Sequence, residues 1–123
     1  MDQLSTISHQ IIGAAIEVHR NLGPGLPEVV YERAMCIEFN LRSVKYEQQV
    51  SADAVYKGHR IGHYRIDFVV EDAVVLEVKS VTAVGPVFEG QVLTYLKLTG
   101  KRLGLLLNFH ERLLTDGVRR FVL

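Results

Sequence analysis

The chain has 123 residues, of which 48% are apolar and 23% charged, so its composition excludes a disordered, collagen-like or coiled-coil protein. It predicts one domain, residues 1–123, with a hydrophobic core of its own. Fourteen basic residues balance fourteen acidic ones, so the overall charge directs the protein neither to nucleic acid nor to a membrane. A single cysteine and the absence of a long apolar run predict a cytoplasmic protein without a membrane span.

Two helices are predicted at the start of the chain. Apolar residues from Leu4 to Val18 recur every three or four positions, which indicates an amphipathic helix of about four turns. The Gly-Pro-Gly segment 23–25 ends this helix. Pro27 suits the first position of a second helix, whose apolar stripe extends to Leu41.

Beyond Ser43 the apolar period changes to two, which predicts strands. One strand leads to a turn at 57–58, and a second strand ends at Val70, with apolar even-numbered positions from 64 to 70 on one face. A third strand covers 73–79, a helix 87–99, and a last strand 118–123. The apolar run 103–109 predicts a buried strand parallel to its neighbour, because a helix precedes it. The expected fold class is α/β, a central mixed sheet flanked by helices in the order ααβββαββ.

Three ionisable residues interrupt the apolar central strands: Asp67, Glu77 and Lys79. Glu77 and Lys79 are two positions apart on one strand, so their side chains project from the same face. A three-residue loop at 71–73 places Asp67 directly opposite Glu77, whereas a two-residue loop sends Glu77 to the other face. We expect the three-residue loop, or a bulge with the same effect.

Two facing carboxylates repel each other, and a hard divalent cation between them keeps both ionised. The residue types therefore predict a site for Mg²⁺, with Mn²⁺ as a substitute, that can polarise a phosphoryl oxygen and activate water. Lys79 on the same face is placed to orient that water or to stabilise negative charge on a phosphodiester. The alternative is a structural salt-bridge network among the same three residues.

The chain resembles the PD-(D/E)XK phosphodiesterase superfamily over residues 11–123. Asp67 and the Glu77-Val78-Lys79 segment match its D…(D/E)xK core, although Ile66 stands where the nominal motif has proline. Two further motifs support the resemblance: Gln91 and Tyr95 have the QxxxY spacing of the exonuclease branch, and residues 25–31 (GLPEVVY) match GxxExxY, the signature of a widespread prokaryotic family.

The resemblance implies a restriction-endonuclease-like core and a metal-dependent nuclease, with DNA as the expected substrate and a homodimer as a possible assembly. It implies that Asp67, Glu77 and Glu28 bind the metal ion and that Lys79 and Gln91 take part in catalysis. Tyr95 and Tyr31 are expected to line the site or contact substrate.

Simpler structural roles compete with these assignments. Glu28 could complement the dipole of its helix, and Gln91 with Tyr95 could be ordinary core packing. His63 shares strand parity with Asp67 and could reach the site, although a lone histidine is more often a surface residue. The alternative function is a binding module that keeps the nuclease fold without catalysis.

Overall fold

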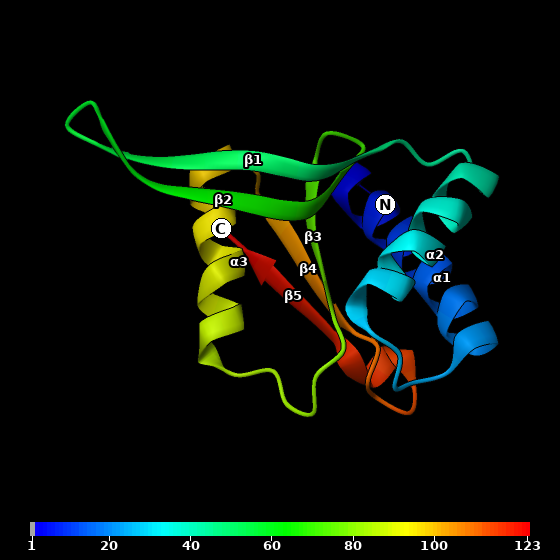
Figure 1. Ribbon diagram of the computed structural model, residues 1–123. Coiled ribbons are helices and arrows are strands. Elements are labelled where there is room, and N and C mark those ends of the chain that lie inside the picture. Colours follow the sequence, from blue (N-terminus) through cyan, green and yellow to red (C-terminus); the bar gives the residue numbers. More distant parts are fainter. Residues whose placement is uncertain (1) are drawn as a thin grey trace.

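The computed structural model describes residues 2–123, which form three α-helices, five strands and one short 3-10 helix (Figure 1). In chain order the elements are α1 (Gln3–Leu22), α2 (Glu28–Leu41), β1 (Tyr46–Tyr56), β2 (His59–Val70), β3 (Val74–Lys79), α3 (Pro86–Thr99), β4 (Leu103–Asn108), η1 (Leu114–Gly117) and β5 (Val118–Val122). The predicted order ααβββαββ is confirmed, and η1 is an addition to it. No helix within residues 2–123 combines the length and apolar character needed to cross a bilayer.

Local sequence sets the ends of the first two helices. The Asp2 side chain caps α1 by accepting a hydrogen bond of 2.8 Å from the Ser5 N–H, and Gly23 ends the helix with φ of 70°. With 20 residues, α1 is longer than the predicted four turns. Pro27 precedes α2 rather than beginning it, because its ψ of 151° is extended; the helix starts at Glu28.

The five strands form one mixed sheet in the order β1-β2-β3-β4-β5. Only β3 and β4 run parallel, which confirms the prediction from the helix between them. The hairpin register is also confirmed, since Val70 pairs with Val74 and Phe68 with Leu76. Continuing this register places Asp67 opposite Glu77.

Helices cover both faces of the sheet. Figure 1 shows α1 and α2 on one side and α3 on the other. The larger buried cluster joins the first two helices to the sheet through residues such as Ile11, Phe39 and Leu76. A smaller cluster, which includes Val75 and Leu96, lies under α3. Burial of both faces explains why β3 and β4 are mostly apolar, with Glu77 and Asn108 as buried polar residues among them.

Side chains of β2 on the two sides of Asp67 point to opposite faces of the sheet, although their even-numbered spacing predicted a single face. We call this the change of face at Asp67. Phe68 packs in the cluster under α1 and α2, whereas Ile66 belongs to the cluster under α3. Gln49, between the pairs that flank Asp67, has a left-handed φ of 50° and interrupts the ladder. Left-handed backbone is unfavourable for glutamine, so local strain coincides with the position where the hairpin changes face. Beyond it the hairpin leaves β3 and crosses α3 (Figure 1).

Candidate active site

Asp67 and Glu77 meet where β2 separates from β3. The backbone ladder ends at the pair of Phe68 and Leu76. At the next position the Asp67 N–H donates to Glu77 Oε2 at 2.8 Å, and the Val78 N–H donates to Asp67 Oδ2 at 2.9 Å. The carboxylates thus replace backbone carbonyls as hydrogen-bond acceptors, and these bonds fix the two side chains in the gap between the strands.

Lys79 projects from the same face of β3 as Glu77, as the two-residue spacing predicts. Its Nζ lies 4.0 Å from Glu77 Oε1 and 4.5 Å from the centroid of the Phe88 ring. The distance to Oε1 exceeds a hydrogen bond, so the contact is ionic and the N–H groups remain able to donate to another oxygen. The ring of Phe88 holds the ammonium in place through a cation–π contact.

Burial controls the electrostatics of the carboxylate pair. Glu77 is only 2% exposed, and burial, with a further contribution from Asp67, raises the pKa of its carboxyl to about 8. Burial also raises the pKa of Asp67, although the Val78 N–H and Lys79 oppose that effect. One ammonium does not balance this acidic pair in a buried site, so near neutral pH the pair takes up a proton or a cation.

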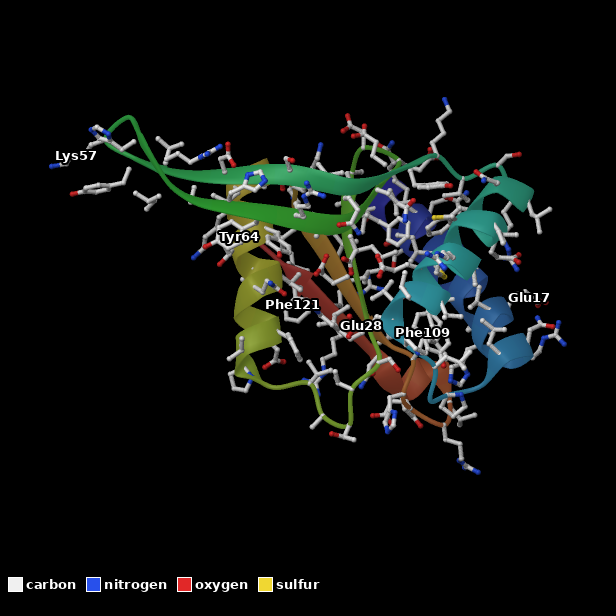
Figure 2. All side chains as sticks on the ribbon, in the orientation of Figure 1. Glu17, Glu28, Lys57, Tyr64, Phe109 and Phe121 are labelled. Carbon is white, nitrogen blue, oxygen red and sulfur yellow. The ribbon has the colours of Figure 1, made fainter. Side chains whose placement is uncertain are left out.

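The GxxExxY segment folds into a loop that attaches α2 to the end of β3. The Tyr31 hydroxyl donates to the Gly23 carbonyl and accepts from the Leu26 N–H. Ser80 is held from two directions, since its hydroxyl donates to the Leu26 carbonyl at 2.7 Å and its N–H donates to Glu28 Oε2 at 3.3 Å. Because Ser80 directly follows Lys79, these bonds hold Glu28 at the end of β3 that carries Lys79. Figure 2 shows Glu28 beside β3.

Tyr31 itself does not line the site, which corrects the expectation from the sequence. Its side chain is fully buried and stacks on Phe109 with ring centroids 4.4 Å apart. Because its hydroxyl is used within the loop, Tyr31 supports the position of Glu28 and is not available to a substrate.

Glu32 is an acidic neighbour of the site that the sequence reasoning missed. It lies one helical turn after Glu28, and its Oε1 accepts a hydrogen bond of 3.2 Å from Gln49 Nε2. Burial, with contributions from Asp67 and Glu28, raises the pKa of Glu32 to about 7. The spacing of four residues between the two glutamates was the available signal, because it places both on one face of α2.

One face of α3 completes the surroundings of the carboxylates. Phe88 contacts Lys79, and the Tyr95 hydroxyl donates to the Arg65 carbonyl at 3.4 Å. Gln91 lies on the same face between them, and its Oε1 is buried without a hydrogen-bond partner among residues 2–123. Tyr95 is 2% exposed, and burial near the acidic pair raises its pKa to about 12. It therefore lines the carboxylate site as a neutral phenol and positions β2 beside Asp67.

His63 does not join the site. Its Nδ1 lies 2.6 Å from Asp53 Oδ1 on the neighbouring strand, and both side chains are exposed. The two-residue period of a strand predicts that His63 and Asp67 point to the same face. The change of face occurs at Asp67, so the side chains of His63 and Asp67 point in different directions.

The donor chemistry fits a hard divalent cation, although within residues 2–123 no three carboxylate, imidazole or thiol groups form a preassembled metal cage. The backbone bonds use Oδ2 of Asp67 and Oε2 of Glu77, which leaves Oδ1 and Oε1 for a cation. The unpartnered Oε1 of Gln91 is a further hard oxygen that can accept from a water or face a cation. Glu28 would have to exchange its long bond to Ser80 for a place at the metal.

A family model described as the PD-(D/E)XK nuclease superfamily matches residues 5–121. The chain therefore belongs to this superfamily, and its mixed sheet with flanking helices is consistent with a restriction-endonuclease-like fold. Searches of curated proteins and of solved structures found no match. Members of the superfamily are generally nucleases that use divalent metal ions, so membership supports a hydrolase with a nucleic acid substrate.

Proposed function

We propose that this protein is a metal-dependent nuclease of the GxxExxY group that hydrolyses phosphodiester bonds in DNA, with Mg²⁺ as its metal ion and Mn²⁺ as a substitute. The observation that carries the proposal is the pair formed by the buried Glu77 and the half-buried Asp67, with Lys79 beside it. This pair lies between two diverging strands, with one ammonium for two carboxylates. A structural salt bridge needs no second carboxylate, whereas a cation site does.

Each of these residues has a distinct role in hydrolysis. Asp67 and Glu77 would hold the metal ion, with Glu28 as a further ligand, and the ion would polarise the phosphate and lower the pKa of a nearby water. Lys79 donates hydrogen bonds to the phosphate or to the attacking water and stabilises the negative charge that develops in the transition state. Gln91 uses its unpartnered oxygen to orient that water.

The attack itself follows from the same arrangement. The water oxygen forms a bond to phosphorus while the bond from phosphorus to the leaving sugar oxygen breaks, and that oxygen takes up a proton. Removal of the proton from the water requires an ionised carboxylate or bulk solvent, because Lys79 is a cation and cannot accept it.

The first test combines a calorimetric titration with Mn²⁺ and a cleavage assay on plasmid and linear DNA. We expect saturable binding by the natural protein and its loss in Glu77→Gln, which removes the ligand charge without changing the side-chain size. Cleavage should fall in the same variant by on the order of a thousandfold or more, since metal catalysis supplies several kcal/mol. Glu47→Gln, an exposed carboxylate on β1, is the matched control and should behave like the natural protein.

Two results would contradict the proposal. Cleavage that survives in Glu77→Gln would show that the reaction is carried out elsewhere or by a contaminant. Absence of metal binding, even with a DNA duplex added to complete the coordination, would favour a binding module that has kept the nuclease fold.

A further inference from the structure

The outer part of the β1–β2 hairpin forms an arm, residues 53–65, that extends past α3. Figure 1 shows its tip well beyond the helices, and Figure 2 places Lys57 at the far end. The ladder between β1 and β2 continues to the pair of Tyr56 and His59, with one shift of register between Ala54 and Val55, so the arm is a two-stranded ribbon with a single irregularity. Its base joins the candidate active site directly, because Asp67 follows the arm by two residues.

The arm carries a local positive charge in a neutral protein. It contains three basic residues, Lys57, Arg60 and Arg65, and a single acidic one, Asp53. Asp53 is shared between His63 at 2.6 Å and Arg60 at 3.9 Å. Among residues 2–123, neither Lys57 nor Arg65 forms a salt bridge. The arm thus presents cations that have no anionic partner in the protein.

Some of the basic residues elsewhere on the surface are paired with acidic side chains. Lys101 is bound to Asp72 at 3.1 Å and Arg119 to Glu89 at 2.8 Å. Arg102 and Arg120, the sequence neighbours of these two residues, form no salt bridge within residues 2–123. The arm differs from these single arginines because its unpaired cations, Lys57 and Arg65, lie along one ribbon that leads to the candidate active site. On this ribbon they can act on an anionic ligand without breaking an internal ion pair.

Exposed apolar side chains accompany the charges. Val55, Tyr56 and Ile61 are 62%, 59% and 68% exposed near the tip. A ribbon that contacts only solvent gains nothing from such residues, whereas a ribbon that lies against bases and sugars buries them. Aromatic and aliphatic groups between cations are typical of nucleic-acid surfaces.

The hairpin turn at the tip of the arm contains Lys57, a residue type that this kind of turn does not favour. Lys57 and Gly58 are the two central residues of the hairpin turn, with φ of 48° and 83°. Such turns strongly favour asparagine at the first of these positions, because left-handed backbone is unfavourable for longer side chains. Lysine at this position costs backbone energy and adds a charge at the furthest point of the arm.

We propose that the arm is the duplex-binding element of the protein, which lies along the nucleic acid beside the phosphate that the active site attacks. The proposal rests on the proposed nuclease function. The ten residues from Asp67 to Lys57 span roughly 30 Å at about 3.3 Å per residue, a length of about nine base pairs. A two-stranded ribbon fits the major groove, which is about 12 Å wide.

A second copy of the chain is the competing occupant. Two arms that pair side by side would bring their unpartnered cations together, and like charges close to one another disfavour that contact. Nucleic acid is favoured because its phosphates complement the same charges.

The test measures binding of a fluorescent DNA duplex of about 30 base pairs by anisotropy, without divalent metal so that no cleavage occurs, at several salt concentrations. The arm variant is Lys57→Asn/Arg60→Gln, in which asparagine suits the turn and both charges are lost. The matched control is Arg20→Gln/Arg112→Gln, which removes two exposed charges that lie together at the C-terminal end of α1, far from the arm in Figure 1. Like Arg60, Arg20 has an acidic neighbour, and like Lys57, Arg112 forms no salt bridge within residues 2–123. Thermal melting verifies that both variants fold.

We expect the arm variant to bind at least about tenfold more weakly than the natural protein. The slope of log affinity against log salt should fall by nearly two, one unit for each lost phosphate contact. The control should match the natural protein.

Equal binding by the natural protein and the arm variant would overturn the proposal, and so would absence of duplex binding by the natural protein. A preference for single-stranded DNA over the duplex would also contradict it. Arm-dependent self-association in a sedimentation experiment, with unchanged DNA binding, would identify the arm as a dimer contact. The two proposals fail separately: binding through the arm without cleavage contradicts only the nuclease, and cleavage with an inert arm contradicts only the arm.

Discussion

Two strands of one sheet carry charged residues in opposite environments. In β3, Glu77 is buried and Lys79 is half-buried, and their charges act on each other and on Asp67. In the outer part of β2, Arg60 is exposed and its side chain points into solvent, with Asp53 at 3.9 Å. Buried charges interact strongly because water screens them little, whereas exposed charges act weakly and over longer range on a partner. The comparison therefore distinguishes the buried site on β3, whose charges suit catalysis, from the exposed arm, whose charges suit the binding of an anionic partner.

After the loss of activity already expected for Glu77→Gln, the largest effect that would test this comparison is expected at Lys79. Lys79→Ala should lower the turnover number by at least about a hundredfold, because it removes a hydrogen-bond donor that stabilises transition-state charge. Lys79→Arg should recover part of the loss. Single-turnover kinetics with saturating metal measures the effect, and calorimetry at alkaline pH should show that Mn²⁺ still binds. If Lys79→Ala cleaves at the natural rate, the assigned role is wrong.

A smaller effect concerns the pH dependence of the metal-free protein. The unfolded Glu77 carboxyl releases its proton near the ordinary pKa of 4.5, whereas the folded carboxyl keeps it to about 8. The folded state therefore binds more protons over this range, and the free energy of unfolding should fall as the pH rises through it. Asp67 and Glu32 shift in the same direction and add to the trend.

Urea denaturation at a series of pH values measures this trend. Glu77→Gln should flatten the dependence of the unfolding free energy on pH, while Lys57→Asn on the arm should keep the same dependence on pH as the natural protein. A divalent cation should restore stability at the alkaline end, because it replaces the lost protons. A curve that rises between pH 5 and 8 without metal, roughly the interval between the two pKa values, would contradict the buried acidic pair.

The smallest effect is expected where the two regions join. Tyr95→Phe removes the hydrogen bond to the Arg65 carbonyl, and the cost should be below about 1 kcal/mol, because the distance of 3.4 Å is long for such a bond. Tyr56→Phe on the arm is the control and should change the stability by less than about 0.5 kcal/mol. Denaturation midpoints compare the two. A cost above about 2 kcal/mol for Tyr95→Phe would mean that the hydroxyl has a further partner.

The carboxylate pair and Lys79 could be predicted because their arrangement depends on one short hairpin. The length of the loop at 71–73 fixes the register, and the register decides which side chains face each other. Glu32 was not predicted, because the sequence shows that it shares a helix face with Glu28 but not which part of the sheet that face meets. The left-handed Gln49 gives no sequence signal, and without it the change of face at Asp67 and the isolation of His63 could not be foreseen.

The sequence by itself determined the order of the elements, the mixed sheet and the chemical groups of the candidate site. These follow from periodicity, turn residues and loop length, which act over a few neighbouring positions. The tertiary structure decided that β2 diverges from β3 at Asp67, that Ser80 holds Glu28 from 52 positions earlier in the chain, and that the hairpin extends as a free arm. Such features depend on how helices and strands far apart in the sequence pack together, and no local pattern encodes that packing.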